Sequence, residues 1–296
     1  MNDEIMIYSR QNNLSERLME LEQEGALISP CQFFYVAVAP EYRERGNVPP
    51  LLYVDRMMQF SGREYYVALM SAADIYRNEI LPESEEGTVG EGGCGRCARD
   101  GSETDRKRGA GDEGDNGNER ENRGGYAGYN GAEGDFSVMV IGERMTLGRR
   151  KKRPVKFYAR QNDVSSEIRR VETAFGPVNV SSPLLTALDL VQKESEAGGL
   201  DRVAEALTFL ADKIEPGADK PAILQEFPTA IIQRLGYLLD AVQAHSRASE
   251  LYRLCADSCM TFRPTPLRAS SAVGIGFETD PRWMVIVNAS IHIMSQ

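Results

Sequence analysis

Few residues in this chain have the types and spacing that could support chemistry. Cys94 and Cys97 form a C-x-x-C pair, and Cys255 and Cys259 form a C-x-x-x-C pair, so a four-thiolate zinc site is conceivable. The second pair falls four residues apart in a helical pattern, where free cysteines usually serve as small core residues. We therefore predict no metal site and no cofactor.

The chain also has few histidines that could support catalysis or metal binding. The chain has two histidines, His245 and His292, in different segments and without a third ligand nearby. This excludes most histidine metal sites and nucleophilic triads. The sequence also has no phosphate-binding loop and no paired-carboxylate motif. We therefore predict that the protein is not an enzyme.

The strongest local charge feature is a basic run that precedes an expected strand. Five adjacent cations suit the phosphates of DNA or RNA, or an acidic partner surface. The alternative is a solvated loop between two strands. We keep the run as a candidate nucleic-acid or partner contact, formed by Arg149, Arg150, Lys151, Lys152 and Arg153.

The segment 82–134 is a low-complexity insert. It is dominated by Gly, Glu, Asp, Asn and Arg and has almost no aliphatic residue, so it cannot bury enough apolar surface to offset the entropy of ordering. From Pro82 to Asp135 fourteen acidic residues face seven basic ones, a balance of −7, so the rest of the chain carries only −3 of the net −10. We predict that the insert is disordered and interrupts one domain.

The bulk properties favour a cytoplasmic protein. At 296 residues and 42% hydrophobic content the chain can bury a sizeable core, and two modest domains are the natural expectation. No apolar run approaches the roughly 20 residues that span a bilayer. Met1–Glu4 has neither part of a secretion signal. Five cysteines in no regular framework indicate a reducing compartment.

The N-terminal part has the pattern of the closing half of a winged helix-turn-helix. Ser15–Glu24 is expected to be a helix, with Gly25 as a left-handed cap. Strands are expected at Ala26–Ile28 and Phe33–Val38, joined by a turn at 29–32. Any small helix and hairpin would produce the same pattern. The helix exposes mostly glutamates, whereas a DNA reader favours Arg, Lys, Asn or Gln.

The middle of the chain predicts a small mixed sheet. Asp55–Tyr76 is interpreted as two helices broken at Gly62. Strands are expected at Phe136–Ile141 and Val155–Ala159, and a hairpin is expected around Phe175-Gly176 with arms at 168–173 and 177–180.

The C-terminal half predicts a helical layer. Ser182 and Pro183 are a helix N-cap and first helical residue, and Gly198-Gly199 separates this helix from a second one with a 3.6-residue period. Further helices are expected at 223–227, from Pro228, and at 248–259, and a last strand at Trp283–Val287. The fold class is therefore α+β.

Four residues of this half have specific expected roles. Asp189 faces away from the apolar stripe of its helix, so we expect it on an exposed polar face. Gly236 costs about 1 kcal/mol in a helix interior, which favours close packing of another backbone against it. Tyr237 suits a core aromatic. Trp283, the only tryptophan, is expected to anchor a strand.

Five short stretches follow one another in the chain: YYVALMSAA at 65–73, VNVSSP with TALDLV at 178–191, AGGL at 197–200, QRLGYLL at 233–239 and DPRW at 280–283. In this order they resemble the AbiEi family of abortive-infection antitoxins. The similarity covers Leu14–Tyr76 and Phe136–Asn288 and leaves the insert unmatched. Its candidate structural positions are Ser182, Pro183, Asp189, Arg234, Gly236, Tyr237, Arg282 and Trp283.

The resemblance implies a type IV antitoxin that acts in phage defence. Such a protein opposes a nucleotidyltransferase-like toxin encoded beside it, and its N-terminal winged helix represses its own promoter. We expect a partial winged-helix-like segment at 1–45, truncated because about thirteen residues precede its helix, and an antitoxin domain at 46–296. A stand-alone DNA-binding regulator and an inactive remnant remain as alternatives.

Overall fold

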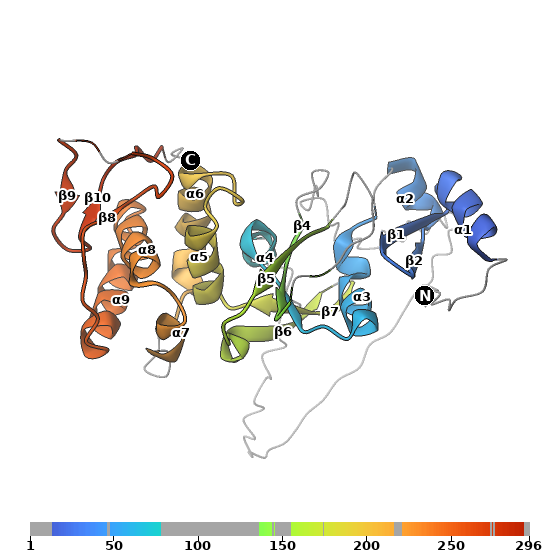
Figure 1. Ribbon diagram of the computed structural model, residues 1–296, viewed down its shortest axis with the longest axis horizontal. Coiled ribbons are helices and arrows are strands. Elements are labelled where there is room, and N and C mark those ends of the chain that lie inside the picture. Colours follow the sequence, from blue (N-terminus) through green and yellow to red (C-terminus); the bar gives the residue numbers. More distant parts are fainter. Residues whose placement is uncertain are drawn as a thin grey trace, which may run out of the picture. The chain divides into compact units, whose positions relative to one another are not determined.

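The computed structural model describes residues 14–45, 48–77, 136–143, 145, 155–173, 175–215, 221–272, 274 and 276–292 (Figure 1). All of these residues belong to one compact unit, formed by Met1–Pro82 and Asn130–Gln296. The insert, the basic run Arg149–Arg153, and the pair Cys94 and Cys97 lie outside the described residues, so the predictions made for them stay predictions.

The N-terminal segment is a helix followed by a hairpin, as predicted. Helix α1 (Leu14–Gln23) is followed by Gly25, whose φ of 69° is left-handed. Strands β1 (Leu27–Cys31) and β2 (Phe34–Ala37) pair antiparallel. The predicted turn at 29–32 is wrong by two residues, because β1 continues to Cys31 and the chain reverses at Phe33, where φ is 65°. Helix α2 spans Pro40–Arg45.

A five-stranded mixed sheet forms the centre of the described fold. Its order is β5-β4-β3-β7-β6. Strand β3 is antiparallel to β4 and parallel to β7, β5 is parallel to β4, and β6 is antiparallel to β7. The strands are β3 (Tyr65–Val67), β4 (Phe136–Ile141), β5 (Val155–Arg160), β6 (Ile168–Thr173) and β7 (Gly176–Ser181). The predicted strand at 136–141 and the predicted hairpin are confirmed.

The prediction of two helices in Asp55–Tyr76 is wrong in its second half. Helix α3 (Val54–Ser61) ends at Gly62 as predicted, but the central strand β3 follows before α4 (Leu69–Arg77) begins. Three residues are too few to show strand alternation beside an apolar helix. Their conformation is set by pairing with β4 and β7 on both sides, and the chain leaves the strand at Leu69, where φ is 55°.

Helices cover both faces of the sheet. Successive strand residues point to opposite faces, and the Tyr65 hydroxyl bonds Asp55 of α3 while the Tyr66 hydroxyl bonds Asp189 of α5. Helix α3 therefore lies on one face and α5 on the other. Short 3₁₀ helices span Pro50–Leu52 (η1), Ser165–Glu167 (η2) and Ala211–Lys213 (η3).

The C-terminal helices form the predicted layer. Helix α5 packs against α4, α6 and α8, and α8 packs against α9 (Figure 1). Gly198 and Gly199 both have positive φ before α6, which confirms the predicted break. None of the helices in the described ranges has the length and apolar character that a bilayer span requires. The helices are α5 (Pro183–Gln192), α6 (Leu200–Leu210), α7 (Pro221–Gln225), α8 (Thr229–Ala241) and α9 (His245–Asp257).

The predicted strand Trp283–Val287 is shorter than expected. Strand β10 (Val285–Ile286) lies between β8 (Thr265–Pro266) and β9 (Thr279–Asp280). Trp283 instead belongs to the turn before β10, since Met284 has a φ of 52°. The fold is α+β, as predicted.

Candidate functional site

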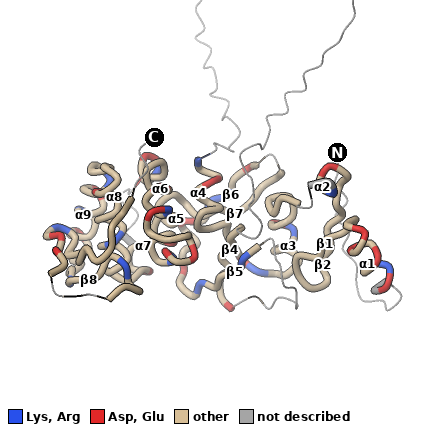
Figure 2. The backbone as a smooth tube through the Cα atoms, turned by 90° about the horizontal axis from the view of Figure 1, so that it is seen from above, with Lys and Arg blue, Asp and Glu red and all other residues tan. Residues whose placement is uncertain are grey.

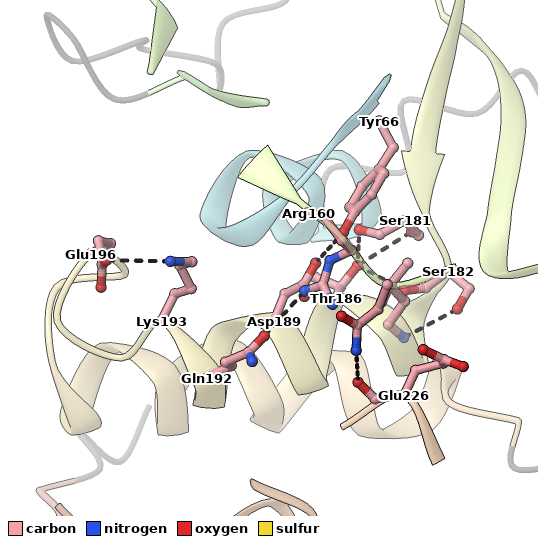
Figure 3. Close-up of polar contacts among 12 residues, drawn as sticks. Tyr66, Arg160, Ser181, Ser182, Thr186, Asp189, Gln192, Lys193, Glu196 and Glu226 are labelled. Atoms are coloured by element: carbon pink, nitrogen blue, oxygen red, sulfur yellow. Dashed lines mark hydrogen bonds and ion pairs between the residues drawn. The ribbon is translucent and has the colours of Figure 1, made fainter. Parts of the chain in front are cut away.

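A buried polar network joins the sheet to the helical layer. Tyr66 of β3, Arg160 at the end of β5 and Asp189 of α5 converge there (Figure 3). The Tyr66 hydroxyl donates to Asp189 Oδ2 at 3.0 Å, and Arg160 Nη2 forms an ion pair with Asp189 Oδ1. The same Nη2 donates to Gln192 Oε1 at 3.2 Å. Both carboxylate oxygens of Asp189 are therefore engaged.

The expectation that Asp189 lies on an exposed face is wrong, because the residue is 0% exposed. Helix α5 has no exposed face from Pro183 to Val191, since the sheet and three helices surround it. The sequence carried a signal that the helical-face argument missed: Asp189 is the only ionisable residue among the nine residues from Pro183 to Val191. A charge in such a helix needs a partner from another element.

Burial dominates the electrostatics of this network. Loss of hydration raises the pKa of Asp189 to about 6, although Arg160 and the Tyr66 hydrogen bond act to lower it. Burial and the charge of Asp189 likewise raise the pKa of Tyr66. The Arg160 guanidinium lies 4.9 Å from the Phe227 ring centroid, and its Nε has no hydrogen-bond partner among the described residues.

A second set of buried hydroxyls fixes the start of α5. Ser182 Oγ accepts from Leu185 N at 3.2 Å, which confirms the predicted N-cap, and donates to Glu167. Ser181 Oγ and Thr186 Oγ1 lie 2.7 Å apart. All four of these polar side chains are buried, so they serve the junction between β7 and α5.

The opposite face of the sheet has its own ion pair, which sequence reasoning missed. Asp55 accepts from the Tyr65 hydroxyl and from Arg170 Nη2, both at 2.7 Å. Partial burial acts to raise the pKa of Asp55, but the hydrogen bonds from Arg170 and Tyr65 outweigh it and the pKa is lowered. Helix α3 is thereby tied to β3 and β6.

A separate cluster forms around Trp283. The indole is 0% exposed, and its Nε1 donates to Asp240 Oδ2 at 2.8 Å. Arg282 Nη1 reaches the same carboxylate at 3.0 Å. A Cβ on Gly236 would lie 2.3 Å from the Trp283 ring, so the close approach expected at Gly236 exists. The approaching group is the Trp283 ring, not another backbone as predicted.

Two other candidate positions of the resemblance, Arg234 and Tyr237, lie on α8 together with Gly236. Arg234 Nε donates to the Pro266 carbonyl at 2.7 Å, and burial lowers the pKa of Arg234. Tyr237 is half-buried and lines a surface pocket, so it is not the core aromatic that was expected.

The eight candidate structural positions thus separate into two groups. Ser182, Pro183 and Asp189 belong to the junction between sheet and helices, and the other five belong to α8 and the C-terminal tail. Cys255 is buried in α9 as expected, but Cys259 is exposed because α9 ends at Asp257. In the part of the chain that is described, no group of three or more His, Cys, Asp or Glu could hold a metal.

This arrangement has the chemistry of a structural framework. Within the described ranges, Asp189 pairs with Arg160, Asp55 pairs with Arg170 and Asp240 pairs with Arg282. Asp189 itself is 0% exposed. Such networks specify how layers pack and are costly to break.

The same α+β fold occurs in a known structure. The crystal structure of the RV2827C protein from Mycobacterium tuberculosis aligns with a TM-score of 0.55, at 13% identity, over 94% of this chain and 80% of that chain. At that identity the likeness establishes the fold alone. No curated protein matches the chain.

The central region of the chain is similar to a known protein family. Residues 125–241 match the AbiEi antitoxin C-terminal domain. This range holds β4 to β7 and α5 to α8, and therefore Arg160, Asp189 and the Ser182 junction. This part of the chain is therefore similar to the AbiEi antitoxin domain, and the predicted resemblance is confirmed over this range. The expectation that the whole insert is unmatched is wrong at its end, because the match begins at residue 125.

Proposed function

We propose that the protein is the antitoxin of a type IV toxin–antitoxin system and opposes a nucleotidyltransferase-like toxin encoded beside it in phage defence. One observation carries this proposal: the antitoxin match covers the part of the chain in which the sheet and the helical layer meet. The buried networks there support a function exercised through the outer surface, by contact with other macromolecules.

Co-expression tests this function. The toxin gene is induced in a host that lacks the system, with and without this chain, and growth is followed. We expect rescue of growth by the full chain and no rescue by a control with a stop codon before residue 136. Failure of the full chain to rescue, at equal toxin levels, would contradict the proposal.

A second candidate function is DNA binding, which the helix and hairpin at 14–37 favour by their order. The charge of α1 opposes it, because Glu16, Glu20 and Glu22 outnumber Arg17 on this helix (Figure 2). Acidic side chains repel phosphates. A shift of operator DNA without growth rescue would favour a stand-alone regulator, rescue with a shift would favour an autoregulating antitoxin, and neither would favour an inactive remnant.

We further propose that the basic run Arg149–Arg153 contributes to recognition of nucleic acid or of the toxin. Its position just before β5 places it within the matched antitoxin range. Replacing all five residues with Ser should weaken growth rescue or reduce the salt dependence of DNA binding. Unchanged values of both quantities would contradict this role. The division into a segment at 1–45 and an antitoxin domain at 46–296 remains part of the proposal.

A further inference from the structure

A pocket of about 380 Å³ opens on the surface beside α8. This volume lies in the range of pockets that hold a small ligand or an inserted side chain. One wall comes from the end of α8 and the other from the C-terminal tail. The lining residues are Tyr237, Ala241, Phe277, Val287, Asn288, Ala289, Ser290 and Ile291. We call this site the Tyr237 pocket.

The tail wall of the pocket is held in place by hydrogen bonds. Asn288 Oδ1 accepts from Arg268 N at 2.9 Å, and its Nδ2 donates to the carbonyls of Arg268 and Ser271 at 3.0 and 3.1 Å. The backbone of Val287 donates to Glu278. The pocket therefore exists before any partner arrives, which reduces the entropy lost on binding.

The pocket is lined mainly by apolar residues, and one of them is an exposed aromatic side chain. Phe277 is 45% exposed, although it lines a pocket whose other walls include Val287 and Ile291. Burying its ring and the neighbouring Ile291 and Val287 against another apolar group would gain free energy in proportion to the area covered. An inserted aliphatic or aromatic side chain fits this lining.

The charges around the mouth are acidic. Glu278 directly follows Phe277, and burial together with the charge of Asp280 raises the pKa of the Tyr237 hydroxyl. At the tail, Asp201 accepts from the backbone N–H of His292, which follows Ile291, and its carboxylate also lies 3.7 Å from the His292 ring. The nearby cations Arg282 and Arg268 are already paired, with Asp240 and Glu194 respectively. The rim therefore attracts cations.

We propose that the Tyr237 pocket is a docking site for a partner protein segment that inserts one large apolar side chain beside Phe277 and carries Lys or Arg on either side. The proposed antitoxin function leaves the contact surface for a partner unassigned, and this site goes beyond it. Peptide segments use an apolar anchor for affinity and flanking charges for specificity and orientation.

Short synthetic peptides test the site without knowledge of the natural partner. The probe is a capped peptide with a central leucine flanked by lysines, and binding to the full chain is measured by calorimetry. Two matched peptides replace the leucine with alanine or the lysines with glutamates. We expect the lysine–leucine peptide to bind at least about tenfold more tightly than either control, because each control removes one kind of contact.

Two protein variants locate the binding. Ala241→Phe fills the pocket and should weaken binding of the lysine–leucine peptide about tenfold or more, whereas Ala256→Phe, at an exposed position of α9, should leave it unchanged. Glu278→Lys should reduce the preference for lysine over glutamate. Circular dichroism confirms that each variant is folded.

Three outcomes would overturn the proposal. One is equal binding of the leucine and alanine peptides, which would indicate attraction to net charge alone. Another is binding that Ala241→Phe does not change. The third is a dimer in sedimentation that Ala241→Phe dissociates, which would make a second copy of this chain the occupant. Growth rescue by the Ala241→Phe variant separates this site from the antitoxin function, because rescue can persist while peptide binding is lost.

Discussion

At the scale of single residues, Asp189 decides how the sheet and the helical layer meet. Its carboxylate binds Tyr66 from one strand and Arg160 from another, and all three side chains are buried. A buried ion pair is weak evidence for stability, since two charges lose hydration. Removing one partner is nevertheless strongly destabilising because the other charge stays buried.

We therefore predict that Asp189→Ala lowers the free energy of unfolding by about 3–5 kcal/mol. The double variant Arg160→Met with Asp189→Leu should recover most of this loss, because it removes both charges and keeps the volume. Urea unfolding of both variants measures the effect. A double variant that is as unstable as the single one would show that the hydrogen bond to Tyr66, and not the unpaired charge, accounts for the loss.

The raised pKa of Asp189 predicts a specific pH dependence. Its value rises from 3.8 to about 6 on folding, so the folded chain binds this proton more tightly. The stability that Asp189 contributes is complete below about pH 4 and is lost as the pH rises through about 6. The difference in unfolding free energy between the wild type and Asp189→Asn should fall over this window. A rising difference would mean that Arg160 outweighs burial.

At the scale of elements, the start of α5 depends on one hydroxyl. Ser182 caps the helix at Leu185 N and also donates to Glu167. Ser182→Ala should lower the free energy of unfolding by about 1–2 kcal/mol, because it leaves a helix N–H and a buried carboxylate without this partner. Ser195→Ala, at an exposed hydroxyl, is the matched control and should have no effect in the same urea titration.

The contact between α8 and the tail depends on the absence of a side chain. Gly236→Ala places a Cβ where the Trp283 ring lies, so we predict a loss of about 2 kcal/mol despite the better helix propensity of alanine. The fluorescence of Trp283, the only tryptophan, should shift toward that of an exposed indole. In a Trp283→Leu background, the same substitution should become neutral or stabilising when unfolding is followed by circular dichroism.

At the scale of the whole molecule, the insert interrupts a sheet whose strands on either side still pair. Strand β3 and strand β4 are neighbours, with Tyr66 opposite Met139, although α4 and the insert separate them in the chain. A long connection costs little more closure entropy than a short one. The pairing therefore tolerates the insert.

We predict that replacing residues 83–129 with a short Gly-Ser linker leaves the fold intact. Each halving of the length of the connection lowers the entropic free-energy cost of closing it by about 0.6 kcal/mol. The free energy of unfolding should therefore increase slightly. Urea unfolding and the growth assay check stability and function separately. Lower stability would mean that the insert makes contacts that stabilise the compact unit.

The sequence by itself determined the elements whose signals are local. Ser182-Pro183 and Gly198-Gly199 act within one or two turns of their own helices, and the apolar strand at 136–141 stands out from its polar neighbours. The AbiEi resemblance could also be predicted from the sequence, because it depends on the order of short stretches and not on contacts between them.

Only the tertiary structure decided the features that depend on distant partners. Asp189 bonds Arg160, which is 29 positions away in the sequence, and Tyr66, which is 123 positions away. No helical pattern indicates either partner. Tyr65–Val67 is a strand because two other strands pair with it. The ring that fills the space over Gly236 comes from the tail. Burial and pairing between distant segments outweigh local preference by several kcal/mol, so these assignments required the folded chain.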